Sequence, residues 1–141
     1  MFEKAGVFSA REMASRLEIA MEDYTTKVMI EGNCALDMAR TMIAPVVKAE
    51  YRETMDAYVK AREGGIASGT TILHDDIVKL GAGLDALKLR CSELEGGIAK
   101  KDPAAVIAAM TALRTNVDAL EGMVADDKWP LPKYREMLFV Y

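Results

Sequence analysis

An unbroken apolar seam constrains the fold of this chain more than any other feature of its sequence. Apolar residues recur at alternating steps of four and three, at Leu73, Ile77, Leu80, Leu84, Leu87, Cys91, Leu94 and Ile98. This is the heptad spacing of a helix that packs lengthwise against other helices. We therefore predict a helix over residues 71–99 with one side buried against its neighbours.

A second seam of the same kind predicts a helix over residues 103–126. Asp102 stands at the N-cap position and Pro103 at the first helical position, and both residue types are favoured there. The apolar residues that follow again step by four and three, at Val106, Met110, Leu113, Val117, Leu120 and Val124.

The first part of the chain predicts helices over residues 10–31 and 33–63. Ser9 and Glu12 have the spacing of a capping box, which marks a helix start. Apolar residues then recur at helical steps, and a pair of glycines after Glu63 indicates the end.

Two residues can interrupt this long segment. Gly32 permits a bend at a cost of about 1 kcal/mol relative to Ala, and Pro45 should kink the helix near residues 41–44 because it lacks an amide donor. Unbroken, the segment would span roughly 75 Å, about twice the length of its partners. It therefore either folds at Gly32 or Pro45 into two bundle helices, or reaches towards another chain.

The predicted fold class is all-α, because alternating period-two patterns are absent from the sequence. We expect one domain, 1–141, in which three to four helices form an antiparallel bundle with a long, kinked first helix. The tail, 127–141, is too rich in aromatic residues to stay exposed, so we expect it to dock on this bundle, with docking on a partner as the alternative. The structural or interface candidates in the tail are Trp129, Pro130, Leu131, Pro132, Tyr134, Leu138 and Phe139.

Catalytic, cofactor-binding and metal-binding residues are not predicted anywhere in the chain. The single histidine, His74, precedes Asp75 and Asp76, but a second cluster of metal ligands does not accompany it. The glycine pairs lack the spacing of a phosphate-binding loop. Cys34 and Cys91 lie among apolar neighbours and are predicted to be buried free thiols, with a disulfide as the alternative.

The charge pattern excludes a nucleic-acid-binding protein. The net charge is −4, and Lys and Arg are scattered among acids instead of forming a basic face. Apolar runs fall short of the roughly 20 residues that a membrane helix requires. We therefore expect a cytoplasmic protein without a nucleic-acid or membrane partner.

Three segments closely resemble type III glutamine synthetases. Residues 127–139 (DKWPLPKYREMLF) are similar to the closing segment of that family, and residues 36–45 (LDMARTMIAP) to its long helix ahead of a proline. Residues 2–9 (FEKAGVFS) are similar to the segment that opens this helix. Departures are Met29, where the family often has Asn, and Gly32, where it tends to have Ala.

The resemblance implies a C-terminal helical structural or oligomerisation domain of a type III glutamine synthetase. The parent reaction would be ATP-dependent ligation of ammonia to glutamate, with Mg or Mn, in a homo-oligomer. The expected partners are the catalytic region and neighbouring subunits, and this chain alone is predicted to be inactive. The alternative is a free-standing helical module that binds a protein partner.

Overall fold

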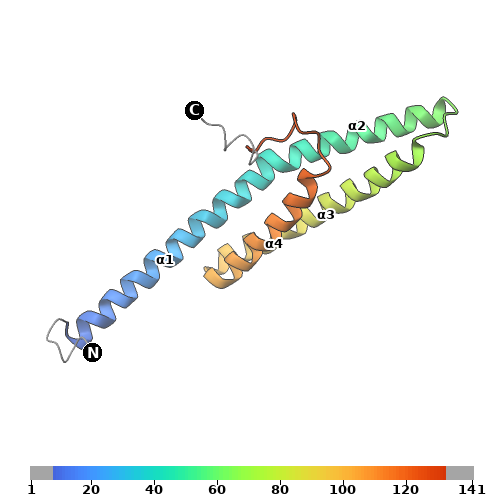
Figure 1. Cartoon of the computed structure of the whole chain (residues 1–141). Helices are drawn as coiled ribbons and strands as arrows, with labels where there is room; N and C mark the ends of the chain where they lie inside the picture. Colours follow the sequence, from blue (N-terminus) through green and yellow to red (C-terminus); the bar gives the residue numbers. More distant parts are fainter. Residues whose placement is uncertain (1–7, 133–141) are drawn as a thin grey trace, which may run out of the picture.

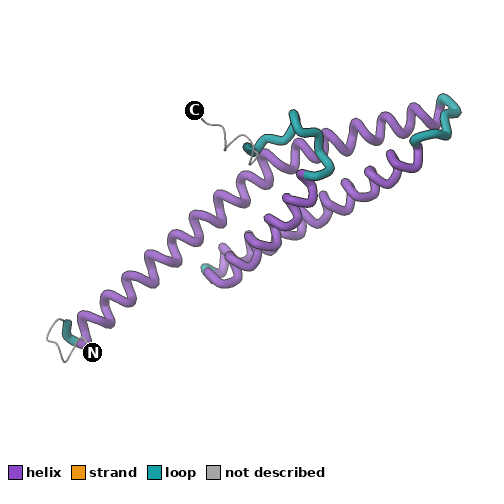
Figure 2. The backbone as a smooth tube through the Cα atoms, viewed as in Figure 1, coloured by secondary structure: helices purple, strands orange, loops and turns teal. Residues whose placement is uncertain are grey.

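A computed structural model of the chain describes residues 8–132, and within this range it contains helices and loops but no strand. The all-α prediction is therefore confirmed. Figures 1 and 2 show an elongated body in which the later helices lie beside the first ones. In chain order they are α1 (Ala10–Met38), the π-helical segment η1 (Ala39–Ile43), α2 (Ala44–Glu63), α3 (Thr70–Lys100) and α4 (Pro103–Glu121).

The first three elements join end to end as one rod, about 80 Å long at 1.5 Å per residue. The predicted separation of helices 10–31 and 33–63 is wrong, because α1 runs through Gly32 without interruption. A Cβ atom at Gly32 would lie only 2.8 Å from Cγ1 of Val106 in α4. Gly32 therefore lets two helices approach closely and does not break the first one.

The irregularity in the rod is η1, immediately before Pro45. Proline has no amide hydrogen, and its ring crowds the carbonyl four residues earlier, so the α-helical bonding pattern cannot continue unchanged. The helical turn takes up one extra residue instead, and the amide of Ala44 donates to the carbonyl of Ala39, five residues back. The predicted irregularity near residues 41–44 is confirmed, although it begins earlier, at Ala39.

The bundle forms where α3 and α4 fold back against the rod. α3 packs against α2 and α1, and α4 packs against α3 and α1. Figure 1 shows α3 and α4 as an antiparallel pair beside the rod. The six largest fully buried side chains come from η1, α2, α3 and α4 and are Ile43, Val47, Leu80, Leu94, Val106 and Leu120.

Two turns fix the direction of the returning helices. After α2, the amide of Ile66 donates to the carbonyl of Ala61 at 2.9 Å, and Gly65 adopts a φ of 70°. Between α3 and α4, Asp102 Oδ1 accepts hydrogen bonds from the amides of Ala104 and Ala105. The predicted glycine stop and Asp102 cap are therefore confirmed.

The last helix is shorter than the sequence suggested. α4 ends at Glu121 and not at residue 126, and Gly122 forms its C-cap. The chain then turns, with the amide of Lys128 donating to the carbonyl of Ala125 at 3.0 Å. Val124 is buried in this turn, so its place in the apolar series reflects core packing and not a continued helix.

The first part of α1 extends beyond the bundle. We call residues 10–27 the arm. Every residue of the arm except Thr25 is exposed, whereas Val28, the next residue, is buried. In Figure 1 the arm continues past the end of the α3–α4 hairpin. It is about 27 Å long at the α-helical rise.

Candidate interaction surfaces

Trp129 anchors the closing segment of the described chain to the bundle. Its side chain is only 8% exposed and belongs to the same buried cluster as Ile43 and Leu113. Leu131 is partly buried against that cluster. Burial of a large aromatic side chain is worth roughly 1.5–3 kcal/mol, which offsets part of the cost of ordering the segment.

An open groove of about 520 Å³ lies beside this anchor. One wall comes from α1 and η1, including Met38 and Ile43, and the opposite wall comes from α4, including Val117. Trp129 and Pro132 line it as well. The groove is therefore mainly apolar and lies where the described chain ends.

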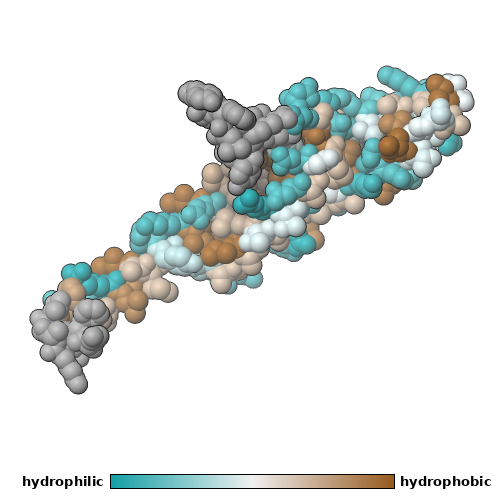
Figure 3. Space-filling view, in the orientation of Figure 1, coloured by the Kyte–Doolittle hydropathy of each residue, from teal (hydrophilic) through white to brown (hydrophobic). Residues whose placement is uncertain are grey.

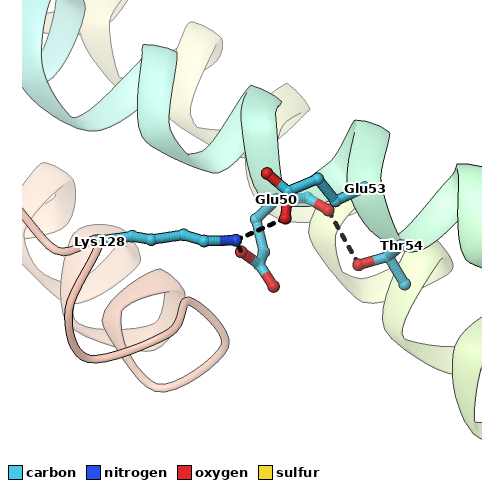
Figure 4. A network of polar contacts seen from close by, with 4 residues as sticks. All are labelled: Glu50, Glu53, Thr54 and Lys128. Carbon is cyan, nitrogen blue, oxygen red and sulfur yellow. Dashed lines mark hydrogen bonds and ion pairs between the residues drawn. The ribbon is translucent and has the colours of Figure 1, made fainter.

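Lys128 ties the same segment to α2 (Figure 4). Its Nζ donates to Glu50 Oε2 at 3.0 Å and to Glu53 Oε2 at 2.6 Å. Hydrogen bonds to Glu53 and then Glu50 raise the pKa of Lys128, and the bond from Lys128 lowers the pKa of Glu53. Thr54 Oγ1 donates to the backbone carbonyl of Glu50 at 2.8 Å.

The predicted tail candidates separate into two groups. Trp129 is buried, Pro130 and Leu131 are partly buried, and Pro132 is exposed. Tyr134, Leu138 and Phe139 lie outside the described residues. Lys128 was not among the candidates, because a partner on another helix leaves no periodic signal in the sequence.

An ion pair on another face of the bundle joins η1 to α3. Arg40 Nη1 and Nη2 donate to Glu95 Oε1 and Oε2 at 3.3 and 2.7 Å, a two-bond arrangement. Hydrogen bonding with Arg40 lowers the pKa of Glu95. The Arg40–Glu95 contact therefore links η1 to α3. Cys91 is buried nearby as a free thiol, and burial raises the pKa of that thiol. The predicted burial of Cys34 is wrong, because this free cysteine lies on an exposed position of α1.

The arm carries the main unpartnered apolar surface among the described residues. Four large side chains recur along one stripe and are each 42–64% exposed, at Met13, Leu17, Met21 and Tyr24. Figure 3 shows brown, hydrophobic surface over the arm. The stripe leads into Val28, which is buried in the core. The helix face that packs the bundle therefore continues uncovered along the arm.

Ligands for metals or cofactors do not gather in the part of the chain that is described. Within residues 8–132, His, Cys, Asp and Glu side chains form no group of three or more that could hold a metal ion. His74 is exposed, and its ring centroid lies 5.9 Å from that of Tyr58. None of the helices within the same residues has the length and apolar character needed to cross a membrane.

Comparison with known proteins relates the chain to glutamine synthetases. The sequence model of the glutamine synthetase C-terminal domain matches residues 1–62. A glutamine synthetase of Bacteroides fragilis (strain YCH46) is 26% identical over 94% of this chain and 20% of its own length. The type-3 glutamine synthetase of Dictyostelium discoideum is 26% identical over 99% of this chain and 21% of its own length. The chain therefore spans about a fifth of these relatives, and the resemblance seen in its sequence is confirmed.

Proposed function

We propose that this chain carries the C-terminal domain of the glutamine synthetase family, since the model of that domain matches it and it has a type-3 homologue. From this premise we infer that the chain is a helical structural and oligomerisation domain. Its partners would be the catalytic region and neighbouring subunits of a cytoplasmic type III glutamine synthetase. That enzyme would join ammonia to glutamate with ATP and Mg or Mn. The chain itself would supply contacts for assembly.

The observation that supports this proposal is the arm with its exposed apolar stripe. Monomeric proteins rarely expose a long continuous apolar surface, and such surfaces usually mark a site of contact. Amphipathic helices bind partners through side chains at steps of three and four, as Met13, Leu17, Met21 and Tyr24 do with their steps of four, four and three. The rest of the bundle holds this helix rigidly at its base, where Val28 and Gly32 are buried.

Co-expression with a shortened synthetase tests the proposal. A type III glutamine synthetase lacking its matching C-terminal fifth would be produced with and without this chain, and assembly would be followed by size-exclusion chromatography with light scattering. We expect the chain to elute with the synthetase and to increase its assembled mass. Separate elution at every ratio would contradict the proposal and favour the free-standing interaction module.

A further inference from the structure

We propose that residues 133–141, which follow the last described residue, pack as a short amphipathic helix in the groove beside Trp129. The described part of the bundle leaves this groove open between the rod and α4. The contact lies within one chain, so it goes beyond the proposed function and does not depend on a synthetase partner. It would leave the arm, and not this groove, as the apolar surface available to other proteins.

The groove has the length and the apolar lining that a short helix requires. Its wall on the rod runs from Ala35 to Ile43, and its wall on α4 runs from Met110 to Glu121. At the α-helical rise these walls are about 12 Å and about 16 Å long. An amphipathic helix binds by laying its apolar face into a groove of this kind. A helix of about eight to eleven residues would match the length of the walls.

The closing segment of the described chain leads into the groove. Lys128 contacts Glu50 and Glu53 on α2. Leu131 and Pro132 then line the groove between the rod and α4. The chain therefore runs from α2 back towards the start of the rod, and Figure 1 shows it beside the rod there. Because the next residues begin at the groove wall, their docking avoids the loss of translational freedom that a separate molecule would incur. This favours the chain's own segment over a second copy or another protein.

The sequence that follows has one apolar helical face. Apolar residues have the spacing i, i+3, i+4 and i+7, at Tyr134, Met137, Leu138 and Tyr141. This spacing places all four on one side of a helix. The nine residues after Pro132 would form a helix about 13 Å long, which matches the groove. Proline is favoured in the first turn of a helix, so Pro132 is compatible with a helix that starts here.

The charges of the groove and of the segment are opposite in sign. The charged residues that line the groove within the described chain are Arg114, Asp118 and Glu121. One positive and two negative side chains give the groove a net charge of −1. The charged side chains of the segment have a net charge of +1 and are Lys133, Arg135 and Glu136. Exposed ion pairs contribute little, so the apolar face would supply most of the contact.

Hydrogen exchange of the full chain tests whether the segment is docked. We expect the amides of residues 137–141 to exchange at least about tenfold more slowly than in an unstructured peptide of the same sequence. Leu138→Glu places a charge on the apolar face and should remove this protection. Phe139→Glu is the matched control, because it changes the neighbouring residue, which lies outside that face, and it should retain the protection. Residues 77–98 should stay protected in both variants, which shows that the effect is local.

Isotope-filtered NMR tests where the segment docks. In the wild-type chain we expect contacts between the methyl groups of Leu138 and the side chains of Met38 or Val117, which line the groove. A mixture of labelled and unlabelled chains separates contacts within one chain from contacts between two. Contacts within one chain would support the proposal. Contacts between two chains would show that a second copy fills the groove and would overturn it.

Three further results would overturn the proposal. Exchange of residues 137–141 at the rate of the unstructured peptide would show that the segment does not dock on the bundle. Equal effects of Leu138→Glu and Phe139→Glu would show that the contact does not use the apolar face. Protection that appears only after the shortened synthetase is added would place the segment on that enzyme, a result that overturns the docking and leaves the proposed function intact.

Discussion

Lys128 Nζ lies 2.6 Å from Glu53 Oε2 and joins the end of the described chain to a helix 75 residues earlier. The same nitrogen also contacts Glu50. This ion pair network and the buried Trp129 beside it hold the closing segment on the rod. The segment lies on the α2 side of the bundle, away from the arm (Figure 1). The segment around Lys128 and Trp129 is therefore packed on the bundle, whereas the arm has no partner within the described fold.

The Lys128 contacts should stabilise the fold over a defined pH range. The lowered pKa of Glu53 means that its contribution is present above the ordinary value of 4.5 and is lost as the pH falls through the lower folded value. The raised pKa of Lys128 means that its contribution is present below 10.5 and is lost only as the pH rises above that value. Lys128→Met should reduce the unfolding temperature at pH 7 and change it little at pH 2.

Thermal unfolding followed by circular dichroism measures this difference. Lys48→Met is the control, because Lys48 is an exposed lysine on the same α2 helix that carries Glu50 and Glu53. An equal loss from Lys128→Met at pH 7 and at pH 2 would show that the network contributes packing and not charge pairing.

Trp129→Ala should lower the free energy of unfolding by about 3–5 kcal/mol, because it removes a large buried aromatic side chain. The wild-type chain has one tryptophan, so its fluorescence reports this site directly. We expect a blue-shifted emission that external quenchers reach poorly. A red-shifted and freely quenched emission would show that the closing segment docks elsewhere.

Two glycines of α3 should respond in opposite directions to the same change. A Cβ atom at Gly83 would lie 2.5 Å from Leu120 Cδ2, whereas one at Gly96 meets no atom within 4 Å. Gly83→Ala should therefore destabilise the fold by about 1–3 kcal/mol through overpacking. Gly96→Ala should stabilise it by about 0.5–1 kcal/mol, because alanine is the better helix former. Chemical denaturation of the two variants would compare them, and stabilisation by both would show that α3 and α4 are less closely packed.

The chain alone should not catalyse γ-glutamyl transfer. Its sequence has no phosphate-binding glycine loop, and residues 8–132 contain no cluster of three metal ligands. The assay would compare the purified chain with and without ATP, Mg and Mn. Metal-dependent product formation by the pure chain would contradict this expectation.

The helices with regular seams were predicted well, because residues at heptad spacing lie on one side of a helix and that side is the buried one. The seam that runs from Leu73 to Ile98 lies in α3, and the cap at Asp102 starts α4. The interruption at Gly32 was predicted wrongly because helix propensity describes only the local cost of glycine within a helix. Its close contact with Val106 depends on the tertiary fold.

The interaction surfaces were only partly predictable for a similar reason. Trp129 stood out by residue type, and the structure places it in the core. Met13 and Leu17 have the same periodicity as buried residues, so the sequence could not show that α3 and α4 stop short of them. The length of the first segment was the only sign that part of it would reach beyond its partners.

Hydrogen exchange along α1 tests the central claim, that the arm is a docking surface, most directly. An unpartnered helix of about 18 residues is only marginally stable, whereas amides in the bundle should exchange slowly. We predict fast exchange for residues 10–27 in the chain alone and slower exchange when the shortened synthetase is added, with residues 77–98 protected throughout. Leu17→Glu, which places a charge in the stripe, should abolish this protection, and Ile19→Glu, on the opposite side of the same helix, should retain it. Fast exchange of the arm in the wild type even with an excess of the shortened synthetase would contradict the account.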